Sequence, residues 1–147
     1  MPAAPAPSRA GAGRRPVLPP PVPRDVVDHA LARRALLRRV TSGGLLTRTS
    51  PDDVCDASKE LLRSAAEAGT ATDRPCPLCR AALHEVAWVF GPSLGSMSGT
   101  PRTPVQLAAL ALRRPEFAVY EVEVCTACRW NHLLRTWTAG RPPEPVR

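Results

Sequence analysis

The first stretch of regular spacing runs from Asp25 to Val40, where apolar residues recur every three to four positions along one stripe. Arg33 interrupts this stripe, and paired arginines spread positive charge over the other sides. Gly43 and Gly44 follow, and glycine is favoured where a helix ends in left-handed backbone. The pattern therefore predicts a first helix from Asp25 to Val40.

A second helical pattern has clear signals at both ends. Ser50 is a favourable N-cap, Pro51 suits the first helical position, and Asp53 stands where a capping box has its acidic residue. Gly69 is the matching stop signal. Because the apolar residues between these ends form a continuous face, residues 25–70 are predicted to form a two-helix segment, a helical hairpin.

Beyond residue 75 the apolar and polar positions alternate with the period of β-strands. Three such runs cover residues 86–90, 118–124 and 133–138, and they predict three strands. In the second run the apolar residues alternate with Glu121 and Glu123.

Two Cys-x-x-Cys pairs flank these strands. Cys76 and Cys79 precede the first strand, whereas Cys125 and Cys128 follow the second strand at the tip of a predicted hairpin. Each pair aims two sulfurs at one point, so two pairs brought together supply the four soft ligands of a tetrahedral zinc ion. A closed four-sulfur site leaves no position for water, so we expect one structural Zn²⁺ and no hydrolytic metal chemistry.

The whole pattern predicts the α+β class. Residues 71–140 are expected to form a three-stranded antiparallel, zinc-ribbon-like sheet, which follows the helical hairpin of residues 25–70. The gap between the two cysteine pairs is longer than usual, and an insertion explains it: apolar spacing from Pro104 to Arg114 predicts a helix that Pro115 ends.

Two other chemistries use the same four thiolates. An iron-sulfur cluster is held by four cysteines, and Cys-x-x-Cys pairs also carry out thiol-disulfide exchange. No residue of this chain distinguishes an iron-sulfur cluster from zinc. Redox chemistry is less favoured, because pairs at strand ends lack the strand-to-helix setting of thioredoxin-like motifs.

Further residues stand close to the predicted site. Cys55 lies on an apolar helical face, so a buried small hydrophobe is favoured over a regulatory or fifth metal thiol. His132 follows the second pair and could replace a ligand, orient one through a hydrogen bond, or lie on the sheet surface.

Arginine and tryptophan residues also flank the cysteine pairs. Arg80 and Arg129 directly follow the pairs, at positions where many zinc ribbons have glycine, so these turns are expected to be slightly strained. Together with Trp130 they are candidates for surface contacts with a partner. Trp88 and Trp137 could stack on nucleic-acid bases, but a small sheet with few aromatic residues needs its tryptophans for the core.

Charge and composition change the picture mainly at the termini. The formal charge is +7, but residues 1–24 hold four arginines, no acidic residue and eight prolines before Arg24, so the folded part is only mildly basic. Residues 1–24 are predicted to be a disordered arm, and residues 141–147 a flexible tail. No segment approaches the roughly 20 apolar residues of a membrane span, so a cytoplasmic protein with reduced thiols is expected.

Four groups of residues occur in a characteristic order: Val26-Val27-Asp28 with Ala30-Leu31 and Arg33-Arg34-Ala35-Leu36-Leu37, then Val54-Cys55-Asp56-Ala57 with Leu61-Leu62-Arg63, then Cys76-Pro77-Leu78-Cys79, then Val122-Glu123-Val124-Cys125 through Cys128 with Trp130-Asn131-His132-Leu133. In this combination the chain resembles a family of short actinobacterial proteins catalogued as a domain of unknown function, over about residues 24–140. The resemblance implies a cytoplasmic protein with a zinc-ribbon-like half, and it implies no activity.

Three functions agree with these observations. The first is a non-enzymatic zinc-ribbon adaptor that binds transcription or translation machinery, a ribonucleoprotein or nucleic acid, with the basic arm and Arg80, Arg129 and Arg135 as contacts. The second is a protein-interaction module in which zinc only stabilises the fold. The third is a thiol redox or iron-sulfur sensor.

Overall fold

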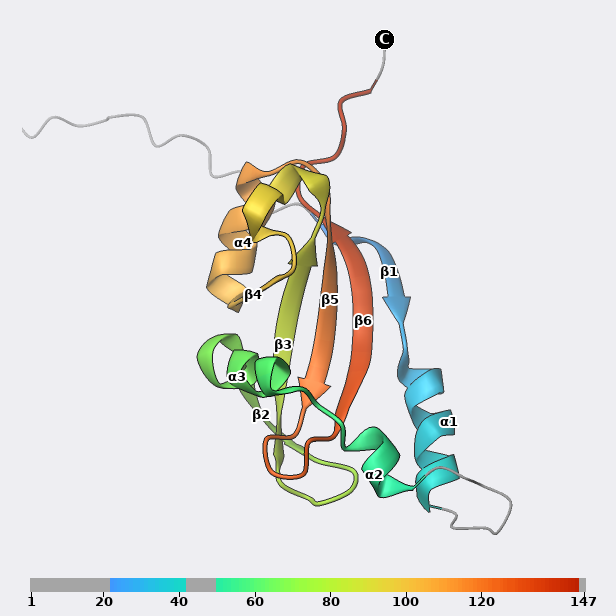
Figure 1. Cartoon of the computed structure of the whole chain (residues 1–147). Helices are drawn as coiled ribbons and strands as arrows, with labels where there is room; N and C mark the ends of the chain where they lie inside the picture. Colours follow the sequence, from blue (N-terminus) through green and yellow to red (C-terminus); the bar gives the residue numbers. More distant parts are fainter. Residues whose placement is uncertain (1–21, 42–49, 146–147) are drawn as a thin grey trace, which may run out of the picture.

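Six β-strands form one antiparallel sheet in the computed structural model, and helices pack against it (Figure 1). The structure describes residues 22–41 and 50–145. The strand order is β1-β6-β5-β3-β2, and the short β4 also pairs with β3. The strands are β1 (Arg24–Asp28), β2 (Thr70–Pro75), β3 (Ala82–Phe90), β4 (Thr100–Arg102), β5 (Phe117–Val124) and β6 (Asn131–Ala139).

The helical segments lie between the strands along the chain. They are α1 (Ala30–Thr41), α2 (Pro51–Val54), α3 (Lys59–Ala68), the 3-10 helix η1 (Pro92–Met97) and α4 (Pro104–Arg113). In α4, the Thr103 hydroxyl accepts a hydrogen bond from the Gln106 backbone N–H, and the Gln106 side chain accepts one from the Thr103 N–H. This capping box fixes the start of α4.

The three predicted strands are confirmed as β3, β5 and β6, and the predicted insertion helix is confirmed as α4. The prediction of a three-stranded sheet was incomplete, because β1, β2 and β4 extend it. Strand β2 pairs with the first half of β3, and β4 pairs with the second half, so the insertion folds back onto the same sheet edge.

The sheet has two faces with separate hydrophobic cores. On one face Val89 and Val119 pack with Leu94 of η1 and Leu110 of α4. On the other face the core contains Val86 and Val124 of the sheet together with Ala57 and Ala65. Alternate residues of β3 and β5 thus serve opposite sides, with α4 over one face and α3 over the other.

The expected helix from Asp25 begins later than predicted. Residues 24–28 form strand β1, which pairs with β6, and the Asp28 carboxylate accepts a hydrogen bond from the Ala30 N–H at 2.7 Å. Val26 and Val27, which the helical spacing included, lie on this edge strand and are more than half exposed. Pairing with a strand more than 100 residues away outweighed the local helical pattern.

The second predicted helix is divided in two. Helix α2 ends at Val54 and α3 begins at Lys59, because Ser58 caps α3 by accepting the Leu61 N–H, while the Ala57 N–H donates to the carbonyl of Arg129. The predicted stop at Gly69 is confirmed as the C-cap of α3.

The predicted helical hairpin is not found in this arrangement. Helix α1 lies along β6, whereas α3 lies against β3, β4 and β5 (Figure 1). Each helix therefore packs on the sheet and not on the other helix.

Parts of the predicted organisation lie outside the described residues. These are residues 1–21 of the expected arm, the connection at residues 42–49 and residues 146–147 of the expected tail. Arg24, which was assigned to the arm, begins β1, and residues 142–145 have no helix or strand. None of the helices within residues 22–41 and 50–145 is long and apolar enough to cross a bilayer.

A buried carboxylate connects the sheet to the elements around it. Glu123 of β5 is fully buried and accepts hydrogen bonds from Arg33 of α1, from Arg74 Nη1 of β2 at 3.1 Å and from Trp130 Nε1 at 3.0 Å. A buried charge is tolerated only with such partners. Glu123 therefore joins α1, β2 and β5 at one point.

We predict that Glu123→Ala lowers the free energy of unfolding by about 3 kcal/mol, because it removes the acceptor of Arg33 Nε and Trp130 Nε1 and one of the two carboxylates that pair with Arg74. Urea denaturation followed by circular dichroism measures this change. The matched control is Glu116→Ala, which removes a surface ion pair with Arg24 and should cost less than about 1 kcal/mol. Equal costs for the two substitutions would contradict the assigned role of Glu123.

Candidate metal centre

Both cysteine pairs lie in tight turns at one end of the sheet. Cys76 and Cys79 lie between β2 and β3, and Cys125 and Cys128 lie between β5 and β6. Because β3 and β5 are antiparallel neighbours, with His84 opposite Val124, the start of β3 and the end of β5 meet at the same edge. The register of these two strands brings the pairs together.

The backbone of the two turns follows one pattern. In the first turn the Cys76 N–H donates to the Ala81 carbonyl and the Arg80 N–H donates to the Cys76 carbonyl, at 2.7 and 3.0 Å. In the second turn the Cys125 N–H donates to the Trp130 carbonyl and the Arg129 N–H donates to the Cys125 carbonyl, at 2.8 and 2.9 Å. The two turns are thus equivalent.

Backbone N–H groups also point at the first sulfur of each pair. The Leu78 N–H lies 3.5 Å from Cys76 Sγ, and the Cys128 N–H lies 3.5 Å from Cys125 Sγ. The residue after each pair has left-handed backbone, with φ of 71° at Arg80 and 73° at Arg129. The strain predicted for these two arginines is therefore present, because left-handed backbone favours glycine.

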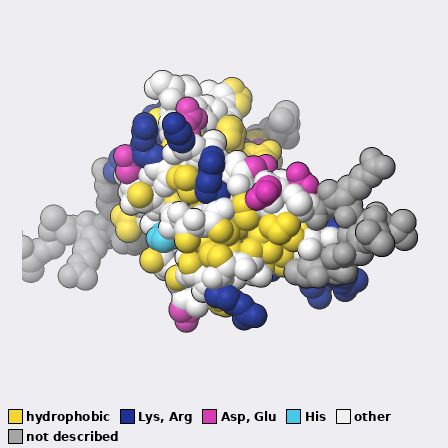
Figure 2. All heavy atoms as spheres, turned by 60° about the horizontal axis from the view of Figure 1, so that its bottom comes forward, with side chains coloured by type: hydrophobic (Ala, Val, Ile, Leu, Met, Phe, Trp, Pro, Cys, Tyr) yellow, Lys and Arg dark blue, Asp and Glu magenta, His cyan; other side chains and the backbone are white. Residues whose placement is uncertain are grey.

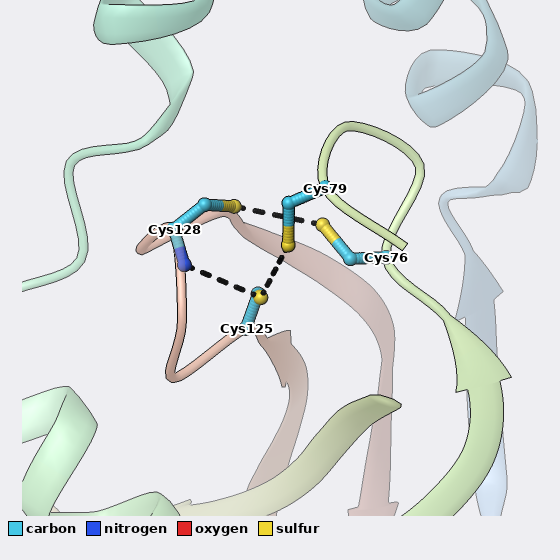
Figure 3. A group of neighbouring side chains, drawn as sticks. All are labelled: Cys76, Cys79, Cys125 and Cys128. Atoms are coloured by element: carbon cyan, nitrogen blue, oxygen red, sulfur yellow. Dashed lines mark hydrogen bonds between the residues drawn. The ribbon is translucent and has the colours of Figure 1, made fainter. Parts of the chain in front are cut away.

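The four sulfurs converge on one point (Figure 3). Cys76 Sγ lies 3.6 Å from Cys128 Sγ, Cys79 Sγ lies 3.4 Å from Cys125 Sγ, and all four sulfurs lie within 4.8 Å of one another. In a tetrahedral site with metal-sulfur bonds of about 2.3 Å, neighbouring sulfurs are about 3.8 Å apart. The cluster therefore has the size of a site for one metal ion.

The protein surroundings shift the pKa of thiols in both cysteine pairs. Burial raises the pKa of the Cys76 thiol and that of the Cys128 thiol. The Ala81 backbone N–H, followed by the Cys125 side chain, lowers the pKa of the exposed Cys79 to about 7. At neutral pH a metal ion must therefore displace protons from Cys76 and Cys128, whereas Cys79 is already about half thiolate.

A hydrophobic cluster supports the cysteines. The buried side chains of Val54, Leu83 and Trp130 pack with Cys76 and Cys125. Half-buried residues complete this cluster, namely Leu36, Leu37, Val40, Cys55, Leu78, Ala81 and Cys128. Helices α1 and α2 thus cover the metal end of the sheet.

The remaining predicted site residues have structural contacts. The Nδ1 atom of His132 lies 2.7 Å from the Leu133 carbonyl, and its ring stacks on Trp130 at a centroid distance of 6.0 Å. Trp130 is buried and donates to Glu123. Arg129 donates through Nε to the Ala57 carbonyl at 2.9 Å, while Arg80 is exposed.

The fifth cysteine lies beside the cluster. Cys55 is half-buried, as a small apolar side chain would be, but its Sγ also lies 3.8 Å from Cys128 Sγ. Sequence reasoning placed it on a helical face, whereas it is the C-cap of α2. Sequence reasoning also missed the contacts of Glu123 with Arg33 and Arg74, for which the sequence carries no local signal.

We predict that the apparent affinity for zinc, used as a probe ion, rises steeply between pH 6 and 8. Each bound thiol that must lose a proton contributes a factor of ten per pH unit, so Cys76 and Cys128 alone give at least about a hundredfold per unit. Competition with a chromophoric chelator at several pH values measures this slope. An affinity that does not change with pH would contradict binding through these two thiols.

Comparisons with known proteins agree with the resemblance seen in the sequence. Residues 21–147 match the profile of a family described as a family of unknown function (DUF5318). The chain is 47% identical over 124 residues to an uncharacterized protein of Mycobacterium tuberculosis, Rv0049, and equally to Mb0050 of Mycobacterium bovis; the match covers 82% of this chain and 88% of each relative. No solved structure matches. The chain therefore belongs to the DUF5318 family, a family of unknown function, and the relatives that it matches are actinobacterial proteins.

Proposed function

We propose that this protein is a non-enzymatic adaptor in which one Zn²⁺ is structural and an open face of the sheet binds a partner protein. The metal site is supported by four cysteine sulfurs that converge from two equivalent turns. A complete set of thiolates satisfies zinc without a water molecule, so the ion would fasten the two hairpins and not activate a substrate. Among the described residues, the four cysteines are the group able to hold a metal.

The chemistry of the donors favours zinc over its rivals. Tight turns with N–H groups directed at the sulfurs suit a single tetrahedral ion, because the two turns leave the four sulfurs within one coordination sphere. A catalytic zinc site keeps one position for water or substrate, and four cysteines leave none.

The partner-binding part rests on an uncovered region of the sheet. Helix α3 covers the end of one face near Val86 and Val124. The rest of this face has a shallow depression of about 420 Å³, lined by Trp88, Phe90, Tyr120, Val122 and Leu133. We call these five residues the aromatic face.

The aromatic face suits an apolar protein segment. Phe90 and Tyr120 are 41% and 39% exposed and meet edge to face, with ring centroids 5.1 Å apart. Aromatic side chains of this kind are enriched where proteins bind one another. The lining contains no charged side chain, whereas a nucleic-acid surface needs cations to contact phosphates.

The arginines expected to contact nucleic acid are largely engaged within the protein. Arg135 forms an ion pair with Glu121, and Arg129 donates to the Ala57 carbonyl. Figure 2 brings the cysteine end forward, and a hydrophobic patch lies there with both basic and acidic side chains at its border. These features favour a protein partner over nucleic acid.

The metal assignment is tested on protein produced with both zinc and iron available. We expect one zinc per chain and a colourless protein, since iron-sulfur clusters absorb visible light. Cys125→Ser should abolish binding and lower the free energy of unfolding by more than about 3 kcal/mol, because structural zinc contributes on the order of 10 kcal/mol in small zinc domains. A brown, iron-containing protein would overturn the assignment.

The partner assignment is tested by affinity purification with and without nuclease. We expect a protein partner that stays bound after nuclease treatment. The combined substitution of Phe90→Ser and Tyr120→Ser should reduce the affinity for this partner at least about tenfold, which is a loss of 1.4 kcal/mol of binding free energy. Leu112→Ser is the matched control, because Leu112 is 45% exposed but lies on α4, away from the aromatic face. Binding that nuclease abolishes, or equal losses in both variants, would contradict the proposal.

A further inference from the structure

Cys55 is fixed against the second cysteine turn by the segment that follows it. Its backbone N–H donates to the Pro51 carbonyl and so closes α2. Two residues later, the Ala57 N–H donates to the Arg129 carbonyl at 3.0 Å, and the Arg129 guanidinium donates back to the Ala57 carbonyl. The connection between α2 and α3 is thereby paired with the turn that carries Cys128.

A third contact strengthens this attachment. Asn131 Nδ2 donates to the Asp56 carboxylate at 2.8 Å, directly beside Cys55. Arg129 and Asn131, which follow the Cys125–Cys128 turn, thus hold the connection between α2 and α3. More than 70 positions separate these two segments in the chain. The position of Cys55 is a consequence of three hydrogen-bonded contacts and not of one flexible side chain.

These contacts leave the Cys55 sulfur 3.8 Å from Cys128 Sγ, in the same range as the 3.4 and 3.6 Å contacts within the cluster. Both cysteines are half-buried. A single tetrahedral ion uses four thiolates, so the fifth thiol remains unbound while it touches a bound one.

We propose that Cys55 and Cys128 form an intramolecular disulfide when the protein meets hydrogen peroxide, and that the metal ion is released as a result. This inference rests on the proposed zinc site. Cys55 is then the thiol that reacts with oxidised Cys128, so that oxidation of this metal ligand ends in a reversible disulfide bond.

The reaction needs one peroxide molecule for each disulfide. The Cys128 thiolate attacks one peroxide oxygen; the O–O bond breaks, hydroxide leaves and takes up a proton from a buffer acid in the solvent, and Cys128 becomes a sulfenic acid. The Cys55 sulfur then attacks Cys128 Sγ, so that the S–S bond forms and the S–O bond breaks. The thiol proton of Cys55 and the departing hydroxide form water. Two thiols lose two electrons, and peroxide is reduced to two water molecules.

Cys55 has an advantage over the other cysteines as the attacking thiol. A disulfide between Cys128 and Cys76, Cys79 or Cys125 would take a second ligand from the metal ion, whereas a disulfide with Cys55 takes none beyond Cys128. Cys55 is outside the four-sulfur group and already in contact with Cys128. Loss of the Cys128 thiolate leaves three ligands, which weakens metal binding.

Peptide mapping tests the disulfide directly on the full chain. Trypsin does not cleave before proline, so the cysteines fall on three different peptides, residues 49–59, 64–80 and 114–129. After peroxide treatment of the zinc-loaded protein and alkylation of free thiols, we expect residues 49–59 to be linked to residues 114–129. Fragmentation between Cys125 and Cys128 locates the bond, and dithiothreitol should reverse it.

Zinc release, followed with a chromophoric chelator, provides a second readout. Cys55→Ser and Cys55→Ala should retain one zinc before oxidation but release it several-fold more slowly in peroxide than the unaltered protein. A link only between residues 64–80 and 114–129, or equal release rates in all three proteins, would overturn the proposal. Because zinc content is measured before peroxide is added, failure of the zinc site itself is recognised separately.

Discussion

The antiparallel register between β3 and β5 is the constraint on which the rest of the structure depends. It places the first cysteine turn beside the second, although the whole insertion with η1, β4 and α4 separates them in the chain. A shift of one residue would exchange the two faces of a strand, so the same register also decides which residues face α3 and which face α4. The cysteine cluster and both cores follow from this one pairing.

Glu123 gives the sheet a second fixed point close to the metal end. Its carboxylate binds Trp130, which packs beneath the cysteines, and it also binds arginines of α1 and β2. The buried charge therefore joins α1 and β2 to β5 by hydrogen bonds, in addition to the apolar packing of α1 around the cysteines.

The cysteine end of the sheet and the aromatic face differ in chemistry. One end carries the thiols and their hydrogen-bonded turns, and the middle of one face exposes aromatic side chains without charge. Four arginines, Arg33, Arg74, Arg129 and Arg135, have partners inside the protein. This separation favours an adaptor whose metal fastens the fold while a different surface meets the partner.

Local features could be predicted from the order of the residues: the three central strands, the capped helix α4, the end of α3 at Gly69 and the similar form of the two Cys-x-x-Cys turns. Each of these depends on neighbouring residues, whose spacing and capping groups are visible in the chain. The tertiary structure alone decided that residues 24–28 form a strand, that residues 55–58 interrupt a helix, that Glu123 is buried and that Cys55 touches Cys128. These outcomes depend on partners from 49 to more than 100 positions away, and at such distances the energy of pairing and burial outweighs local propensity.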